Sequence, residues 1–173
     1  MHPIVESALK IPGWMGDAEL EWLYRTAQGM KSIVEVGSWM GRSTFALLSG
    51  CKGSVTAVDH WQGSPSDTTG PLAKAHDGYA AFFRNVGHFP NLTVLRMPSL
   101  KAAECFKDGS VDMAFIDGEH TIEAATDDYR TWKAKCRRLI CGHDVTHRGV
   151  RDALRAMGVP YRIEAGSIWS QWL

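Results

Sequence analysis

Residues 32–44 read SIVEVGSWMGRST: a β-branched, apolar run that breaks at a glycine and then continues into a helical stretch. We expect residues 32–36 to form a buried strand, Gly37–Gly41 a turn, and residues 42–48 a helix. Gly37 lets the chain leave the strand sharply, and because glycine has no side chain, a ligand can approach the backbone closely. This strand, turn and helix predict the start of an α/β fold that binds a ligand beyond the carboxyl end of the strand.

The rest of the chain repeats this alternation of short β-branched runs and helical stretches, with no internal repeat. Further strands are expected at residues 54–58, 92–95, 111–116, 138–141, 161–164 and 168–172, and further helices at residues 16–28, 122–135 and 149–157. The last two strands would form a hairpin around Gly166-Ser167. The pattern predicts one Rossmann-like, doubly wound α/β domain over residues 1–173, opening with a helical segment at 1–30. Its seven-stranded sheet would be mostly parallel, with an antiparallel C-terminal hairpin strand.

The composition is that of an ordinary globular protein, since 45% of the 173 residues are hydrophobic and 22% are charged. Nineteen basic residues balance nineteen acidic ones. A nucleic-acid-binding protein needs an excess of positive charge to neutralise phosphates, so we expect no nucleic acid partner. The doublet Arg137-Arg138 is expected at a helix end rather than in an RNA-binding patch.

Targeting and membrane signals are not evident in the sequence. The first residues, Met1-His2-Pro3, lack the basic and apolar regions of a signal peptide, and no apolar run approaches the ~20 residues of a membrane span. The four cysteines form no CxxC pair, which argues against a zinc cluster or a disulfide framework. We therefore expect a cytoplasmic protein with reduced thiols and no membrane contact.

The least regular stretch is residues 62–77, which is rich in Gly, Ser, Pro, Thr and Asp. Such a composition predicts a loop, and a loop of this length is unusual as a plain connection. Two interpretations remain open, namely a lid over an active site and an ordinary surface loop. Acceptor specificity would reside in this loop and at the cleft rim.

A phosphate ligand fits the glycine turn poorly. Trp39 occupies the second glycine position of a GxGxxG motif, and no lysine follows Gly41 as in a P-loop. Glu35 at the strand end would also repel a phosphate but suits a ligand that carries an ammonium and a sulfonium. Ser43 or Thr44 could help the next helix to begin and leave N–H groups facing the cleft.

The second strand ends at Asp59, followed by His60-Trp61. A carboxylate at this place can accept hydrogen bonds from both hydroxyls of a ribose, and it lies 22 residues beyond Gly37, close to the spacing of ribose recognition in such folds. Trp61 could stack on an adenine. The alternative for Asp59 is a turn residue at a strand end.

Five segments in order resemble the class I methyltransferases that use S-adenosylmethionine (SAM): EVGSWMGRST, AVDHWQG, FIDGEHTIEAATDDYRTW, the GHD of ICGHDV, and GVRDAL. The sequence is most similar to the small bacterial cephalosporin-hydroxylase-like and macrolide O-methyltransferase subgroup. The resemblance spans nearly the whole chain, including the closing GSIW.

The resemblance implies SAM as cofactor. Glu35 and Gly37 would lie by its methionine part, Asp59 on its ribose, and Ser99 near its adenine. The full set of expected cofactor-binding residues is Glu35, Gly37, Ser38, Gly41, Ser43, Asp59, His60, Trp61, Ser99 and Asp117.

A second constellation comprises Asp117-Gly118-Glu119-His120 and His143-Asp144, which follow two adjacent predicted strands. Asp117, His143 and Asp144 could hold Mg²⁺ or another divalent metal, which would lower the pKa of a substrate hydroxyl. His120 could take the proton, so His120 and Asp117 are the expected catalytic residues. Similar enzymes carry a matching DGxH segment, but this chain departs from them with His143-Asp144 in place of Glu-Asp or Asp-Asn. In the alternative interpretation, Asp117 caps a helix and His143 bonds the backbone.

The leading functional hypothesis is methyl transfer from SAM to a hydroxyl of a small molecule, such as a sugar or natural product, with help from a divalent metal. One alternative keeps the fold and drops the metal, with a histidine acting alone on O or N nucleophiles. Another is a non-catalytic SAM-binding or interaction module, and a metal-dependent hydrolase is more distant because it leaves the glycine turn unexplained. A chain this short can also form a homo-oligomer that closes its cleft with a neighbouring segment.

Overall fold

The stretch that begins at Ser32 forms β1 (Ser32–Val36), an interior strand of the sheet in this computed structural model, which describes residues 1–64 and 77–173. β1 pairs in parallel with β2 (Ser54–Asp59) on one side and with β4 (Val111–Ile116) on the other. Every residue of β4 is buried. Central parallel strands are covered on both faces, which is why their sequences are almost continuously apolar.

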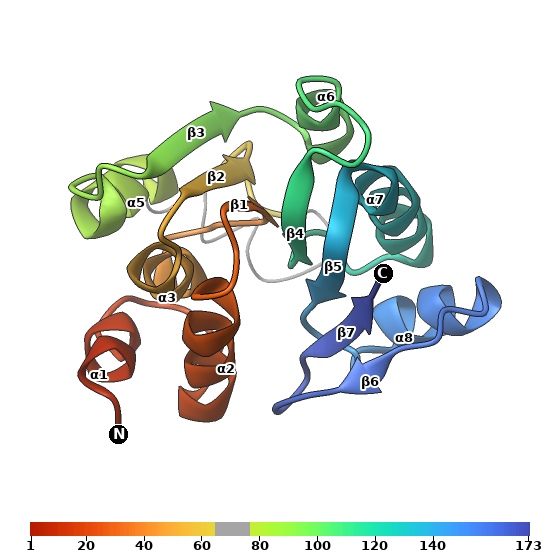
Figure 1. Cartoon of the computed structure of the whole chain (residues 1–173), viewed down its shortest axis with the longest axis horizontal. Helices are drawn as coiled ribbons and strands as arrows, with labels where there is room; N and C mark the ends of the chain where they lie inside the picture. Colours follow the sequence, from red (N-terminus) through yellow and green to blue (C-terminus); the bar gives the residue numbers. More distant parts are fainter. Residues whose placement is uncertain (65–76) are drawn as a thin grey trace.

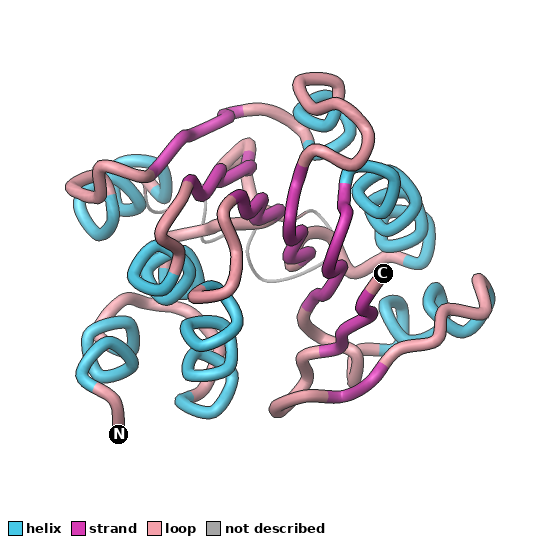
Figure 2. The backbone as a smooth tube through the Cα atoms, in the orientation of Figure 1, coloured by secondary structure: helices cyan, strands magenta, loops and turns pink. Residues whose placement is uncertain are grey.

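The sheet has the order β3-β2-β1-β4-β5-β7-β6 (Figure 1). β3 (Leu92–Arg96) and β5 (Cys136–Gly142) extend the parallel part at its two sides. β7 (Trp169–Trp172) then pairs antiparallel with β5, and the two-residue β6 (Arg162–Ile163) pairs antiparallel with β7 (Figure 2). The predicted seven-stranded, mostly parallel sheet with an antiparallel C-terminal hairpin is confirmed.

Helices cover both faces of this sheet (Figure 1). Those of the first layer, within the described residues, are α1 (Pro3–Leu9), α2 (Asp17–Ala27), α3 (Arg42–Gly50) and α5 (Gly78–Val86). Those of the second layer are α6 (Ser99–Ala103), α7 (Ile122–Lys135) and α8 (Arg148–Ala156).

Alternate strand residues supply the two cores. Ile33 belongs to the core under the first layer, together with Leu23 and Phe115, whereas its neighbour Val34 belongs to the core under the second layer, together with Trp132. Successive side chains of a strand point to opposite faces, so the sheet can bury an apolar surface on each side.

The N-terminal helical segment consists of two helices, α1 and α2, and both pack on α3. α5 was not expected. It begins where the side chain of Asp77 accepts a hydrogen bond from the N–H of Ala80 (2.9 Å), at the end of the stretch predicted as a loop. Most of that predicted loop, residues 65–76, lies outside the described residues. Among the described helices, none has the length and apolar character needed to cross a membrane.

Candidate functional site

A cleft of about 760 Å³ opens at the carboxyl ends of the parallel strands. Its walls include Gly37 after β1, His60 after β2, Asp117 after β4 and His143 after β5. Residues 12–15, between α1 and α2, add a further wall. Ligands of open α/β sheets bind at this edge, and the volume is that of a cofactor or small-molecule site.

Gly37 brings the turns after β1 and β4 together. Its φ is 87°, in the left-handed region, and its N–H donates to the carbonyl of Val58 (2.9 Å). A Cβ at this position would lie 2.0 Å from the carbonyl oxygen of Asp117. Only glycine therefore permits this approach. Gly41, also left-handed with φ 94°, caps α3 and packs on Val86 rather than lining the cleft.

Two serines of this turn, Ser38 and Ser43, line the cleft and are almost completely buried. The Ser38 hydroxyl makes no close hydrogen bond among the described residues, although it lies near enough to Glu35 to lower the pKa of that carboxyl group. Since buried polar groups are nearly always paired, this hydroxyl suits a polar group of a bound ligand. The observation fits a polar cofactor at the turn, as predicted from the sequence.

Arg42 ties the N-terminal segment to the cleft. Its guanidinium donates from Nε to the carbonyl of Ile11 (2.7 Å) and from Nη1 to the carbonyl of Met15 (2.9 Å). These bonds hold the α1–α2 loop, which presents Trp14 to the cleft, against the first turn of α3.

Glu35 does not reach the cleft. It is fully buried in β1, where the hydroxyl of Thr44 donates to its carboxyl group. Burial raises the pKa of Glu35 to about 7, although hydrogen bonds from Ser43 and Thr44 oppose this. The expectation that Glu35 meets a cationic ligand directly therefore needs correction, because its side chain lies behind the turn that it supports.

Asp59 organises the turn after β2. Its carboxylate accepts hydrogen bonds from the N–H groups of Trp39 (2.9 Å) and Trp61 (2.6 Å). Both tryptophans have positive φ, 46° and 56°, which is uncommon for bulky residues and typical of functional sites. Asp59 also lines the cleft, and a carboxylate oxygen can accept more than one hydrogen bond.

The Trp61 ring lies outside the cleft, so the prediction that it stacks on adenine is not retained. Its Nε1 donates to the carbonyl of Trp39 (2.6 Å), and its ring packs on Tyr79 and Phe82. An apolar core was available on this side because α5 packs there. His60, the preceding residue, does line the cleft.

Ser99 lines the cleft beyond β3 and is held from α7. Its hydroxyl donates to Oδ1 of Asp128 (2.5 Å) and accepts from Nε1 of Trp132 (2.8 Å). Asp128 is 6% exposed and also lines the cleft. Burial raises the pKa of Asp128 to about 6, against the hydrogen bond from Ser99.

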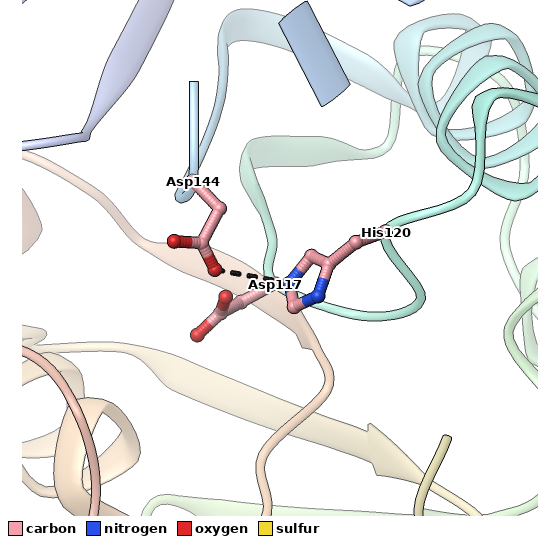
Figure 3. Close-up of side chains that lie close together, drawn as sticks. All are labelled: Asp117, His120 and Asp144. Atoms are coloured by element: carbon pink, nitrogen blue, oxygen red, sulfur yellow. Dashed lines mark ion pairs between the residues drawn. The ribbon is translucent and has the colours of Figure 1, made fainter. Parts of the chain in front are cut away.

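Three side chains that can bind a metal converge after β4 and β5: Asp117, His120 and Asp144 (Figure 3). One ligand atom from each lies within 4.8 Å of the other two. His120 Nε2 is 2.9 Å from Asp144 Oδ2, and Figure 3 shows Asp117 beside this pair. Asp144 has a φ of 57°, which turns its backbone at the strand end. Two carboxylates and an imidazole fit a divalent ion.

His143 lies beside this group, with Nδ1 3.5 Å from Asp117 Oδ1, but its ring nitrogens contact protein groups, contrary to the prediction that it is a metal ligand. Its Nε2 lies 2.9 Å from both Glu19 Oε1 and Ser167 Oγ, and its Nδ1 lies 3.2 Å from Asp144 Oδ2. Burial alone would lower the pKa of His143, but the hydrogen bonds and charges of Asp117 and Asp144 raise it to about 11. Both ring nitrogens are thus engaged with protein groups, and His120 takes the place expected for His143.

Several cleft residues were not anticipated from the sequence. Trp14 and Trp39 lie with ring centroids 6.0 Å apart, and Trp14 is 62% exposed. Glu19, which does not itself line the cleft, contacts His143 across 124 positions of the chain. No local sequence pattern predicts contacts between residues so far apart in the chain. Asp128 did carry a signal, because it lies in the segment DGEHTIEAATDDYRTW that resembles the methyltransferases, but it was not among the predicted site residues.

A family model described as a methyltransferase domain matches residues 34–145, from β1 to just past Asp144. No curated protein matches the chain. The matched span contains the glycine turn, Asp59, and the Asp117, His120 and Asp144 group.

Several solved structures share the fold. A putative O-methyltransferase from Klebsiella pneumoniae is 17% identical, with a TM-score of 0.68 over 100% of this chain and 90% of that one. An O-methyltransferase from Bacillus cereus in complex with SAH is 17% identical, with a TM-score of 0.65 over 98% and 90% of the two chains. The SAH-bound methyltransferase PaMTH1 from Podospora anserina is 14% identical, with a TM-score of 0.67 over 100% and 89%. At these identities the likeness establishes the fold.

Proposed function

The chain belongs to the family of methyltransferase domains, a SAM-dependent class of enzymes, and from this premise we propose that it methylates a hydroxyl group of a small molecule. The observation that carries the proposal is that a single cleft contains both the glycine turn and the group Asp117, His120 and Asp144. Similar folds described as O-methyltransferases support oxygen as the acceptor atom. A non-catalytic binding module has no comparable support.

The turn after β1 and the residues around it would hold SAM. Ser38 and Ser43, whose buried hydroxyls line the cleft next to Glu35, would offer their oxygens to its methionine part. Asp59, already fixed by two backbone N–H groups, would accept hydrogen bonds from the ribose hydroxyls. SAH-bound relatives of the same fold support this assignment.

Bound SAM supplies an electrophilic methyl group on a sulfonium sulfur and leaves as the neutral thioether SAH. His120 would accept the proton that the acceptor hydroxyl releases when its oxygen takes up that methyl group. Asp144, 2.9 Å from Nε2 of His120, would orient the imidazole and stabilise its protonated form. The main contribution of the protein is to align the two reacting atoms.

A divalent metal at Asp117, His120 and Asp144 would lower the pKa of the acceptor hydroxyl and fix its oxygen. The donor set fits such an ion, and the ligand atoms are close enough to share it. His120 would then be a ligand, and another group or solvent would take the proton.

A metal-independent reaction is the second candidate, and a specific observation favours it. His120 and His143 already lie against Asp144, at 2.9 and 3.2 Å, and their hydrogen bonds and positive charge hold the pKa of Asp144 well below its usual range although burial opposes this. The carboxylates thus have partners within the protein.

Calorimetric titration with SAM, with and without Mg²⁺, tests the cofactor assignment, and Asp59→Ala is the control. Micromolar binding that Asp59→Ala abolishes is the expected result, and no binding under either condition would overturn the proposal.

Turnover on a panel of hydroxyl acceptors tests the chemistry. Asp117→Ala and His120→Ala should each remove most of it, whereas unchanged turnover in both would exclude this mechanism. Loss of activity in EDTA that Mg²⁺ restores would select the metal-dependent form.

A further inference from the structure

The end of the cleft next to β3 and α6 contains one buried carboxylate, Asp128 of α7. The lining residues include the apolar Val58, Met97 and Leu100, and the Ser99 hydroxyl lies against the carboxylate. A mostly apolar lining with a few fixed polar groups is the usual arrangement of a small-molecule site, in which the polar groups set the orientation of the ligand.

Within the Ser99–Asp128 pair, only the carboxylate can interact with a ligand, and it does so as a hydrogen-bond acceptor. Ser99 has a single hydroxyl proton, and it donates this proton to Oδ1 of Asp128. Ser99 therefore cannot donate to a ligand, although it was expected near the adenine. The second carboxyl oxygen of Asp128 lies on the side of Gly118, where an added Cβ would be 3.4 Å away, and Gly118 also lines the cleft.

We propose that Asp128 recognises the exocyclic amino group of the cofactor's purine base, accepting its hydrogen bond at Oδ2. The inference rests on the proposed function, since it requires SAM in this cleft. With the ribose on Asp59 at the end of β2, the base would extend toward β3, the next strand of the sheet, where Ser99 and Asp128 lie.

The chemistry of the carboxylate makes this recognition selective. Burial raises the pKa of Asp128 only to about 6, so at a pH well above this value it is ionised and can only accept hydrogen bonds. A 6-amino group donates to such an oxygen, whereas a 6-oxo group would be repelled by it. A site built to bond one group rejects the analogue that lacks it, because its own buried polar atom is left unpaired.

Asp127, the neighbouring residue, provides a matched control. It carries the same charge and also lines the cleft, but it is exposed to solvent. If Asp128 acted only by making the cleft negative, Asp127 would act in the same way.

The test is calorimetric binding of two ligands, SAH and S-inosylhomocysteine, which has a 6-oxo group in place of the amino group, at a pH well above 6. Wild-type protein should prefer SAH by roughly 10- to 100-fold, the range of a hydrogen bond to a charged group. Asp128→Asn should lose most of this preference, because an amide can donate to the 6-oxo oxygen. Asp127→Asn should retain it.

Each other outcome is decisive. Equal binding of both ligands by the wild type overturns the inference, and so does an unchanged preference in Asp128→Asn or an equal loss in Asp127→Asn. Because the wild-type ratio is measured independently, the inference stays falsifiable if Asp128→Asn fails to fold. Absence of SAH binding by the wild type instead overturns the proposed function, which is a separate result.

Discussion

At Gly37 a single hydrogen in place of a methyl group decides whether the strand ends can meet. Gly37→Ala would combine a left-handed backbone with a Cβ 2.0 Å from the Asp117 carbonyl oxygen. We expect it to reduce the free energy of unfolding by more than about 3 kcal/mol and to prevent SAM binding. Urea denaturation measures the first effect and calorimetry the second.

Gly158→Ala is the control, since Gly158 is also left-handed, with φ of 65°, but has nothing within 4 Å of the added Cβ. It should lose only the backbone preference, about 1 kcal/mol. Equal destabilisation by the two substitutions would show that the contact with Asp117 has no special cost.

The raised pKa of Glu35 makes the free energy of unfolding depend on pH. Its pKa rises from an ordinary 4.5 to about 7, so the native protein binds a proton that the unfolded chain releases. The stabilisation from this proton is complete below pH 4.5 and is lost as the pH rises through 7. Relative to Glu35→Gln, the wild type should lose roughly 3 kcal/mol across this interval. Urea denaturation of both proteins from pH 4 to 8 measures this, and parallel curves would contradict it.

At the scale of elements, a partly buried hydrogen-bond network joins α2 to the turn before β7. Glu19 on α2 accepts hydrogen bonds from the N–H of Ser167 (2.9 Å) and from its hydroxyl (3.2 Å), and meets His143 of the loop after β5. Gly166, with φ of 52°, allows this approach because a Cβ would lie 2.3 Å from the Glu19 carboxylate. Three segments distant in sequence are thus fixed behind the Asp117, His120 and Asp144 group.

Removing Glu19 should leave His143 and Ser167 without this partner. We expect Glu19→Ala to lower the free energy of unfolding by roughly 3 kcal/mol. Glu21→Ala on the same helix removes only an exposed pair with Arg25 and should cost below about 1 kcal/mol. Thermal denaturation of the two variants compares them, and similar midpoints would argue against the network.

Elements were predictable where local pattern and packing agree. The sequence predicted β1 and β4 from their apolar runs, which arise because both faces of the sheet are covered. It predicted α7 from the helical spacing of its apolar residues. α5 was missed because its first residue follows a Gly- and Pro-rich stretch. Trp61 was misplaced for a related reason: it looks like a ligand-stacking residue until α5 is known to provide a core for its ring.

The site residues also fall into those that the sequence predicts and those that depend on packing. Gly37, Asp59, Asp117 and Asp144 follow strand ends, and strand ends of a parallel sheet share one edge, so sequence order was enough to group them. That His120 rather than His143 joins Asp117 and Asp144 was not predictable from the sequence. It depends on Glu19, whose position follows from the packing of α2 rather than from any local motif.

For the whole molecule, ligand binding and folding are linked. If SAM binds only the native state, a concentration one hundred times Kd adds about 2.7 kcal/mol of stability. For a chain of this size that is a rise in Tm of roughly 5–10 °C. Thermal unfolding with added SAM measures it, with methionine as a control that should have no effect. An unchanged Tm at saturating SAM would contradict binding to the native state.

The tryptophans give the protein its own optical reporter. Trp14 and Trp39 border the cleft, and Trp14 is largely open to water, whereas Trp132 and Trp169 are buried in the core. Excitation of the native chain therefore samples a red-shifted emission, from Trp14 at the cleft mouth and from the exposed Trp172 outside it, and a blue-shifted emission from the interior. A ligand that enters the cleft changes the first and leaves the second as an internal reference, so occupancy can be followed in the unlabelled protein.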